Sequence, residues 1–360
     1  MKKNSRNGIV SLWKFIFAAV IILFHTHIFY ENDNIPFFKN SYIACEFFFV
    51  VAGFYFAKNV LKEKYNKETI GKDTFSFIWK KISSFLPYIL ISYILCIIFK
   101  LLNDKMTIDY LINSIWNPLL IKSFGFRGPL MISPIWFLTA MLTSMFFLYP
   151  FLKKHKENFI YIASPLIVLF VLGYLSTIKV GLDFAYKEWI IFTRSGMLRG
   201  FAEINIGMIL YLIHNKLESV KYTNIYRTFL TLSSNGSLIG ILVITSIIKR
   251  SPVYDYAFLL LISISILIMT SEKTIEYKFL SNKFNTFLEK ISMPMFISHV
   301  LFIDIFYQVS KFQHMEPLLK SLLSLLSTIV FSIIIVQIVE LFQKKHIIKK
   351  ITKKIVIKEG

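Results

Sequence analysis

The sequence contains few cysteines and none of the common motifs for nucleotide binding or serine hydrolysis. Its two cysteines, Cys45 and Cys96, both fall in apolar segments, so neither a disulfide framework nor a Cys/His metal site is indicated. There is no glycine-rich phosphate loop that ends in Lys-Ser or Lys-Thr, and no Gly-x-Ser-x-Gly nucleophile elbow. We therefore expect no P-loop nucleotidase, no serine hydrolase of the elbow type and no bound metal.

Charged residues are also scarce. They make up 17% of the 360 residues, whereas 55% are hydrophobic and the mean hydropathy is +0.60. The apolar residues form blocks long enough to span a bilayer, which a soluble domain or a membrane β-barrel would not show. No small-residue cleavage site follows the first block, so we expect it to remain as a helix. The sequence predicts an all-α, polytopic membrane helical bundle.

Ten apolar segments are long enough to cross the membrane. We expect residues 1–343 to form one transmembrane domain and residues 344–360 to form a basic tail that lies on anionic lipid headgroups. The predicted spans are 9–30, 41–60, 80–102, 132–152, 158–177, 196–215, 227–248, 253–271, 291–310 and 318–343.

The positive charges sort by side of this predicted membrane. With the N-terminus inside, the inner segments hold 27 of the 41 Lys and Arg residues, the outer segments hold 13, and Lys14 lies within the first span. Both termini are therefore predicted to be cytoplasmic. The net charge of +20 is spread along one side of the membrane rather than over one domain, so we expect no nucleic-acid partner.

The first span carries three ionisable side chains. An ionisable group inside a spanning helix costs about 2.5–3.5 kcal/mol, which marks such residues as functional candidates. Lys14 and His25 are eleven residues apart, so they lie on one face of a helix and about 16 Å apart along its axis. His27 points elsewhere and is expected in the interface. The alternative is that all three side chains snorkel toward the two headgroup layers.

Further ionisable residues lie inside the predicted spans, and two pairs stand out. Glu46 is expected at the depth of His25 on the neighbouring span, where a carboxylate would raise the basicity of the imidazole. Arg199 and Glu203 are spaced to pair along one helix. The alternative is a structural role in intramembrane hydrogen bonds. The remaining members of this group are His299, Asp304 and Glu340.

Five short motifs follow one another on these spans in a fixed order. The first span has a basic residue, Lys14, then ten residues and a histidine. The second has an acidic residue followed by Phe-Phe and later Ala-Gly, over residues 46–54, and the fourth opens with Trp-Phe-Leu at 136–138. The last two motifs are residues 198–207, with Arg199 and Glu203, and residues 292–299, which end in His299.

In these motifs the sequence resembles the acyltransferase family 3 proteins, which are integral membrane acyltransferases. The likeness extends over most of the chain. One motif departs from the family pattern, in which the third helix begins with two basic residues three apart. Counting back from Pro87, the first basic residue is Lys81, but the second position is Ser84. If these positions contact the donor's phosphates, this chain must use Lys80, Lys81 or other lysines, which bind as point charges.

The resemblance implies an acyl transfer, with acetyl as the default group, from cytoplasmic acetyl-CoA to a hydroxyl of an extracytoplasmic glycan or lipid-linked sugar. It implies His25 as general base or acyl carrier, Glu46 as the residue that orients it, and Arg199 as a donor to the oxyanion. It also implies a multi-pass protein of a bacterial plasma (inner) membrane. The candidate substrate-binding residues are Lys14, Lys80, Lys81, Trp136, Glu203 and His299.

Two other function classes fit parts of the pattern. A transporter or flippase for a lipid-linked oligosaccharide or small molecule would also have ten spans with scattered charges. A transporter does not need an acid–histidine pair together with the basic residues Lys80 and Lys81 at the cytoplasmic start of the third span. This combination favours the acyltransferase. A sensor or scaffold without catalysis is the third possibility, and Ser84 in place of a basic residue favours it.

Overall fold

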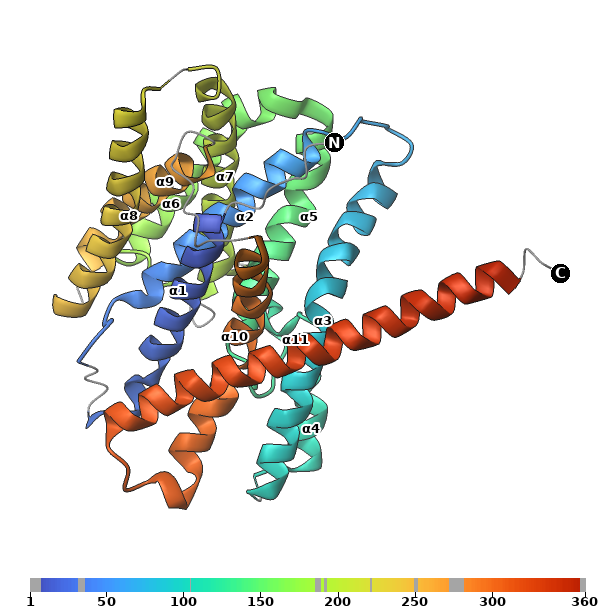
Figure 1. Ribbon diagram of the computed structural model, residues 1–360, viewed down its shortest axis with the longest axis vertical. Coiled ribbons are helices and arrows are strands. Elements are labelled where there is room, and N and C mark those ends of the chain that lie inside the picture. The colour runs from blue at the N-terminus through green and yellow to red at the C-terminus, as the bar shows by residue number, and fades with distance from the viewer. Residues whose placement is uncertain are drawn as a thin grey trace.

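The computed structural model of the protein describes residues 8–31, 36–103, 105–184, 189–190, 193–220, 222–248, 252–271 and 282–356. In these residues the chain is almost entirely helical, as the apolar blocks predicted (Figure 1). The only strands there form a short antiparallel hairpin, β1 (Trp189–Ile190) and β2 (Thr193–Arg194).

The helices follow one another with short connections. The α-helices are α1 (Gly8–His25), α2 (Ala44–Val60), α3 (Ile70–Leu102), α4 (Ile108–Ser114), α5 (Ile135–Asn158), α6 (Ser164–Ile178), α7 (Ser195–Leu217), α8 (Asn224–Ile247), α9 (Asp255–Thr270), α10 (Asn282–Gln308) and α11 (Pro317–Val356). Short turns of 3-10 helix are η1 (Thr26–Phe29), η3 (Ser41–Ile43), η4 (Lys122–Phe124), η6 (Pro252–Tyr254) and η7 (Ser310–Phe312), and η5 (Phe159–Ala163) is a π-helical turn.

Nine segments of the described chain are long and apolar enough to cross a membrane. One of them, Ile135–Ile178, has 44 residues and contains a break at Lys156, whose φ of 53° and ψ of −134° are not helical. The break and the π-helical turn η5 separate α5 from α6, so this segment supplies two of the ten predicted spans. The predicted polytopic helical bundle is confirmed.

The start of the third span was predicted wrongly. It was expected at residue 80, but α3 begins at Ile70, so residues 70–79 of the predicted connection between the second and third spans are helical. The last span was predicted to end at 343, in agreement with the apolar segment Pro317–Gln343, although the α11 helix itself continues to Val356. A helix can extend past the apolar part of a span because its backbone hydrogen bonds do not depend on hydropathy. The division of the chain at 343 stays a prediction.

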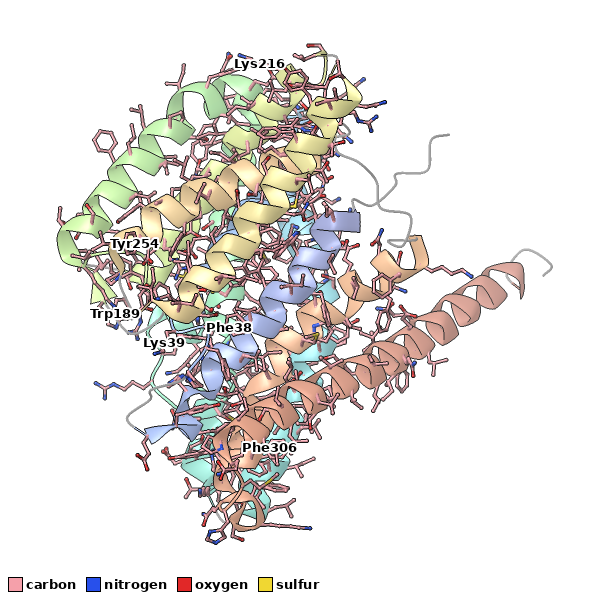
Figure 2. The ribbon with its side chains drawn as sticks, turned by 60° about the vertical axis from the view of Figure 1, so that its left-hand side comes forward. Phe38, Lys39, Trp189, Lys216, Tyr254 and Phe306 are labelled. Atoms are coloured by element: carbon pink, nitrogen blue, oxygen red, sulfur yellow. The ribbon has the colours of Figure 1, made fainter. Side chains whose placement is uncertain are left out.

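Contacts between α1 and α10 define two ends of the bundle. Lys14, in the first half of α1, pairs with Glu289 near the start of α10, whereas His25 at the end of α1 meets His299 further along α10. We call the first the basic end and the second the histidine end. Figure 2 shows Lys216, at the end of α7, and Phe306, near the end of α10, at opposite ends of the molecule.

Helices α2 and α7 approach each other closely at two glycines. A Cβ on Gly53 would collide with the backbone carbonyl of Ile204, and one on Gly207 would collide with the backbone of Val50 and Phe54. Small residues let helix backbones come together in a membrane, where van der Waals contact rather than the hydrophobic effect drives association. Gly53 and Gly207 therefore set the position of α7, and with it that of Arg199 and Glu203.

Helix α11 covers α10 and part of α1. Its N-terminal end is tied to the first segment of the chain by a hydrogen bond between the hydroxyls of Tyr30 and Ser321, 3.3 Å apart. Its C-terminal end extends past the other helices in both views (Figures 1 and 2). This packing holds α10, which carries His299, against α1, which carries His25.

Candidate active site

The centre of the candidate site is a pair of histidines. The imidazole rings of His25 and His299 stack at 24°, with ring centroids 5.1 Å apart. His25 is the last residue of α1 and is partly exposed, whereas His299 is fully buried. The sequence named both residues as candidates, and the fold brings them together from helices at opposite ends of the chain.

Hydrogen bonds distinguish the two nitrogens of His299. Its Nδ1 lies 2.8 Å from the carbonyl oxygen of Phe296, an acceptor, so Nδ1 carries the proton and Nε2 is left as an acceptor. Nε2 is buried and has no hydrogen-bond partner among the described residues. A buried acceptor without a partner is costly, so a bound hydroxyl or a water molecule is expected there.

Aromatic rings surround this pair. The His299 ring packs on Phe296, which in turn contacts Phe48 of α2 and Phe137 of α5, with centroids 5.9 and 5.3 Å apart. His27 lies to one side, its ring centroid 6.4 Å from that of His25, and its Nδ1 is 3.0 Å from the carbonyl oxygen of Phe24. The histidine pair therefore has an apolar wall on the side of α2 and α5.

Glu46 does not pair with His25, contrary to the prediction. Its carboxylate forms an ion pair with Arg199, which also binds Glu203 at 3.1 Å, as the spacing on α7 predicted. All three side chains are buried. The prediction failed because matched depth on neighbouring helices does not fix which faces meet, and an ion pair between α2 and α7 compensates a buried charge better than a neutral imidazole would.

The guanidinium of Arg199 makes four of the five hydrogen bonds that it can donate. Its three nitrogens donate to the two carboxylates, to the carbonyl of Tyr42 and to the carbonyl of Phe184. The ring of Trp136, predicted to bind substrate, lies 6.0 Å from the guanidinium carbon and packs on Phe49. Each nitrogen of Arg199 already has an acceptor, which argues against its predicted role as donor to an oxyanion. Arg199 thus links α2, α7 and the segment before β1. We call Arg199, with the carboxylates of Glu46 and Glu203, the Arg199 brace.

The sequence analysis missed Asp255. This carboxylate is fully buried, accepts hydrogen bonds from the hydroxyl of Tyr42 at 3.0 Å and from the backbone N–H of Leu182 at 2.7 Å, and so holds the segment before β1 against α9. Tyr42 thereby joins Asp255 to the Arg199 brace. The sequence contained a signal for Asp255, because this acid lies at the start of the predicted span 253–271 and ionisable residues inside predicted spans are functional candidates.

The predicted donor-binding residues lie at the basic end. The ammonium group of Lys14 is 3.8 Å from the Glu289 carboxylate, and that of Lys81 lies over the ring of Phe77, 5.2 Å from its centroid. Lys80 is exposed. Ser84 is also exposed, and its hydroxyl donates to the carbonyl of Lys81 at 2.7 Å.

Beside these lysines, Glu63 joins the segment after α2 to α5. Its carboxylate accepts hydrogen bonds from Lys153 and Tyr149, and its backbone carbonyl accepts one from Lys156. Partial burial by itself would raise the pKa of Glu63, but the hydrogen bonds from Lys153 and Tyr149 and the positive charges of Lys153 and Lys80 lower it below its ordinary value.

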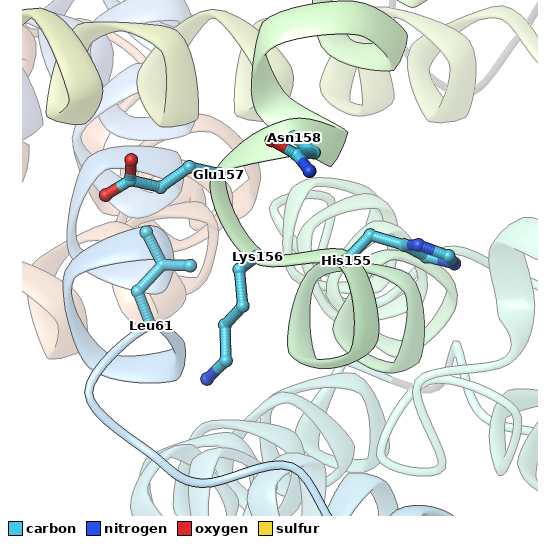
Figure 3. Close-up of a pocket in the computed structure, with 5 residues that line it drawn as sticks. All are labelled: Leu61, His155, Lys156, Glu157 and Asn158. Atoms are coloured by element: carbon cyan, nitrogen blue, oxygen red, sulfur yellow. The ribbon is translucent and has the colours of Figure 1, made fainter.

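A cavity of about 340 Å³ opens at the break between α5 and α6. Figure 3 shows it between the end of α2 and the turn of the chain at Lys156. It lies at the basic end, away from the histidine pair. The residues that line it are Leu61, His155, Lys156, Glu157 and Asn158.

The other intramembrane acids of the sequence analysis form ion pairs near the two ends of the bundle. Asp304 lies 3.6 Å from Lys100 at the histidine end, and Glu340 pairs with Lys290 at the basic end. The candidates thus fall into three groups: the His25–His299 pair, the Arg199 brace with Glu46, Glu203 and Trp136, and the lysines of the basic end. This separation suits a reaction whose two substrates enter from opposite ends of the bundle.

One of three comparisons with known proteins gives a match, and it is to a protein family. The model of the family described as "Acyltransferase domain", acyltransferase family 3, matches residues 7–337. No curated protein and no solved structure gives a significant match. The matched range contains all the residues of the three groups above, but not Glu340.

Proposed function

The chain belongs to acyltransferase family 3, and on this premise we propose that it is a membrane O-acyltransferase that carries an acyl group across the bilayer. The donor is cytoplasmic acyl-CoA, with acetyl as the default group, and the acceptor is a hydroxyl of an extracytoplasmic glycan or glycolipid. The membrane is the plasma (inner) membrane of a bacterium. In this proposal the basic end, with both termini, faces the cytoplasm, as the distribution of Lys and Arg suggests.

One observation carries this proposal: the partly exposed imidazole of His25 stacks on His299 at the end of the bundle opposite the basic end. A nitrogen of His25 would remove the proton of the acceptor hydroxyl as its oxygen attacks the thioester carbonyl. The carbon–sulfur bond then breaks and the thiolate of CoA leaves. The alternative within the same reaction is that His25 first accepts the acyl group on its ring nitrogen.

His299 supports the same step. Its unpartnered Nε2 is an acceptor beside the ring of His25, where it can receive a hydrogen bond from the acceptor molecule. The phenylalanine wall of the pair excludes water, which limits hydrolysis of the thioester. His299 is therefore a substrate-binding residue in this proposal.

The donor would enter from the basic end. Lys14, Lys80 and Lys81 lie there, and their ammonium groups suit the phosphates of CoA. Lys14 and His25 are about 16 Å apart along α1, so the acyl-bearing arm of the donor has to reach into the bundle. Glu46, Arg199 and Glu203 act as positioning residues that fix α2 and α7 beside this path.

The test is the acetyl content of the cell-surface polysaccharide in cells that carry the wild-type chain or His25→Ala at matched protein level. Loss of glycan O-acetyl groups only with the variant is the expected result. A different result would identify a transporter: the acetyl content of the glycan is unchanged in cells with His25→Ala, but the glycan is absent from the cell surface or retained inside the cell. The wild-type protein should also release CoA thiol from acetyl-CoA when the purified glycan is present, and failure to do so would contradict the proposed donor.

A further inference from the structure

Two lysines from different helices share one aromatic ring at the basic end. The ammonium group of Lys14, on α1, lies 5.5 Å from the ring centroid of Tyr55, and that of Lys58, on α2, lies 6.0 Å from the same centroid. A cation near an aromatic ring is attracted by the quadrupole of the ring, and more strongly where water is excluded. Tyr55 therefore gathers two positive charges that the sequence places 44 residues apart.

A third lysine joins this group. Lys81, on α3, lies close enough to Lys14 for the two charges to repel each other. The carboxylate found against the group is Glu289, which pairs with Lys14 at 3.8 Å. In the part of the chain that the structure describes, Lys58 and Lys81 form no ion pair. Lys14 thus has a carboxylate partner, whereas Lys58 and Lys81 bring positive charges to the group for which the described residues show no paired carboxylate.

Such a group is unfavourable unless an anion completes it. Like charges repel more strongly near a membrane protein's interior than in water, because the effective dielectric constant is lower. Lys14 has only 22% of its side-chain surface exposed, so water screens it incompletely. A phosphate group accepts charge-assisted hydrogen bonds from several ammonium groups at once and would remove the repulsion.

We propose that Lys58 and Tyr55, with Lys14 and Lys81, form a phosphate-binding site at the basic end of the bundle. The new assignment is Lys58: it supplies a positive charge from α2 where α3 has the neutral Ser84. Two sources carry the required phosphate, namely the acyl donor and the headgroup of an anionic lipid. The choice of the donor rests on the proposed function; the site itself rests on the convergence of the three lysines.

The experiment measures ligand affinity rather than turnover. The full chain, in nanodiscs of phosphatidylcholine, is titrated calorimetrically with CoA, 3′-dephospho-CoA and pantetheine. Lys58→Gln is expected to weaken CoA binding about tenfold, or about 1.4 kcal/mol. It should leave pantetheine binding unchanged and flatten the salt dependence of CoA binding. Lys58→Arg keeps the charge and should retain most of the affinity.

Lys62→Gln is the matched control, because Lys62 lies four residues further on in the same basic segment and is exposed. It changes the net charge by the same amount and should alter CoA affinity by less than twofold. Equal effects of Lys58→Gln and Lys62→Gln on CoA would mean a general surface charge effect and would overturn the donor assignment. A monodisperse elution profile checks that each variant is folded.

The lipid arm separates the two sources. The same variants are placed in nanodiscs that contain phosphatidylglycerol, and protein-bound lipid is quantified by native mass spectrometry. One outcome is that the wild-type chain binds no CoA and that the Lys58→Gln variant holds less phosphatidylglycerol than the wild type. The phosphate site then stands with a lipid ligand, and the donor of the proposed function is wrong. If neither CoA nor phosphatidylglycerol binding depends on Lys58, the site is refuted.

Discussion

The ring of His25 stacks on the ring of His299, so the last residue of α1 and a buried residue of α10 form one unit. The Nδ1 atom of His299 is committed to the Phe296 carbonyl, which fixes the ring and leaves Nε2 without a partner in the described structure. His25 is partly exposed and packs on His299, whose ring is fixed by its hydrogen bond. Its position is therefore defined, while part of its surface stays accessible. That combination suits a base that must meet a substrate hydroxyl.

The first prediction separates His25 from His27. His25→Ala should abolish acyl transfer at normal membrane expression, because the base is lost. His27→Ala should be mild, with a change of less than about threefold, because its Nδ1 is occupied by a local backbone carbonyl and it does not pack on His299. Glycan O-acetyl content and membrane protein level are measured for both. Equal losses in the two variants would refute the assignment of His25.

The second prediction concerns His299. His299→Phe keeps a flat ring against His25 but removes the Nε2 acceptor. We expect a decrease in transfer of about 100-fold, within the range for a lost acid–base or positioning group, and an increase in KM for the glycan. Acetyl-CoA affinity should be unchanged, because donor binding belongs to the other end. Wild-type KM with reduced donor affinity would contradict the predicted role.

The third prediction concerns the Arg199 brace. Arg199→Leu alone leaves the buried Glu46 and Glu203 without their counter-charge, which costs about 3–5 kcal/mol, and should eliminate folded protein. The variant in which Arg199, Glu46 and Glu203 are all replaced by Leu should recover expression, because a network without charges carries no desolvation penalty. Yield and elution profile in detergent report the recovery.

Transfer activity of the triple variant then distinguishes the two roles of the brace. Activity within about tenfold of wild type is expected if these residues only position α2 and α7. A triple variant that is folded but entirely inactive would show that Arg199 or Glu46 acts directly on the reacting groups.

The fourth prediction tests the close approach of α2 and α7. Gly207→Ala places a Cβ against the backbone of Val50 and Phe54, which cannot move aside as a side chain can. We expect a decrease in apparent Tm of at least about 5 °C, or loss of folded protein. Gly236→Ala on α8 is the control, because its Cβ would meet nothing within 4 Å. It should be neutral or stabilising, since alanine favours helix.

The fifth prediction is a pH dependence at the basic end. The pKa of Glu63 is held below 4.5 in the folded chain, so the unfolded state binds more protons between the two pKa values. The stabilisation by Glu63 is therefore complete above the unfolded pKa and is lost as pH falls through the folded pKa. The effect is small, because 47% of the carboxylate side chain is exposed.

Glu63→Gln should accordingly lower the apparent Tm by about 1–3 °C at pH 7, and the difference should decrease below the unfolded pKa and disappear as the pH falls through the folded pKa of Glu63. A thiol-reactive dye measures it, since Cys45 and Cys96 are buried and free and become accessible on unfolding. A difference between the variants that stays the same from pH 7 down to the acid range in which Glu63 is protonated would show that its charge is not responsible.

The sequence by itself determined the fold class and the place of most helices. A bilayer requires each spanning segment to be apolar over about 20 residues and to satisfy its own backbone hydrogen bonds, and both requirements are local. The predicted spans 41–60 and 196–215 therefore lie within one or two residues of the observed Ser41–Val60 and Ser195–Leu217. The start of α3 at Ile70 was missed, because a polar helical turn outside the membrane has no hydropathy signal.

The candidate residues were also visible in the sequence, because an ionisable group in an apolar segment is costly enough to stand out. The pair Arg199–Glu203 was predicted correctly, since both residues lie on one helix and the i, i+4 spacing fixes their contact. The partners of His25 and Glu46 were predicted wrongly, because they depend on which helix faces touch across long stretches of chain.

Only the tertiary structure decided those contacts. Gly53 and Gly207 bring α7 against α2 and place Arg199 at Glu46, while α11 covers α10, which holds His299 at His25. The approach of Lys14 and Lys58 to Tyr55, and of Lys81 to Lys14, has the same origin. Periodicity fixes the face on which a residue lies, but packing between helices selects the partner, because it balances every buried charge and every close backbone contact at once.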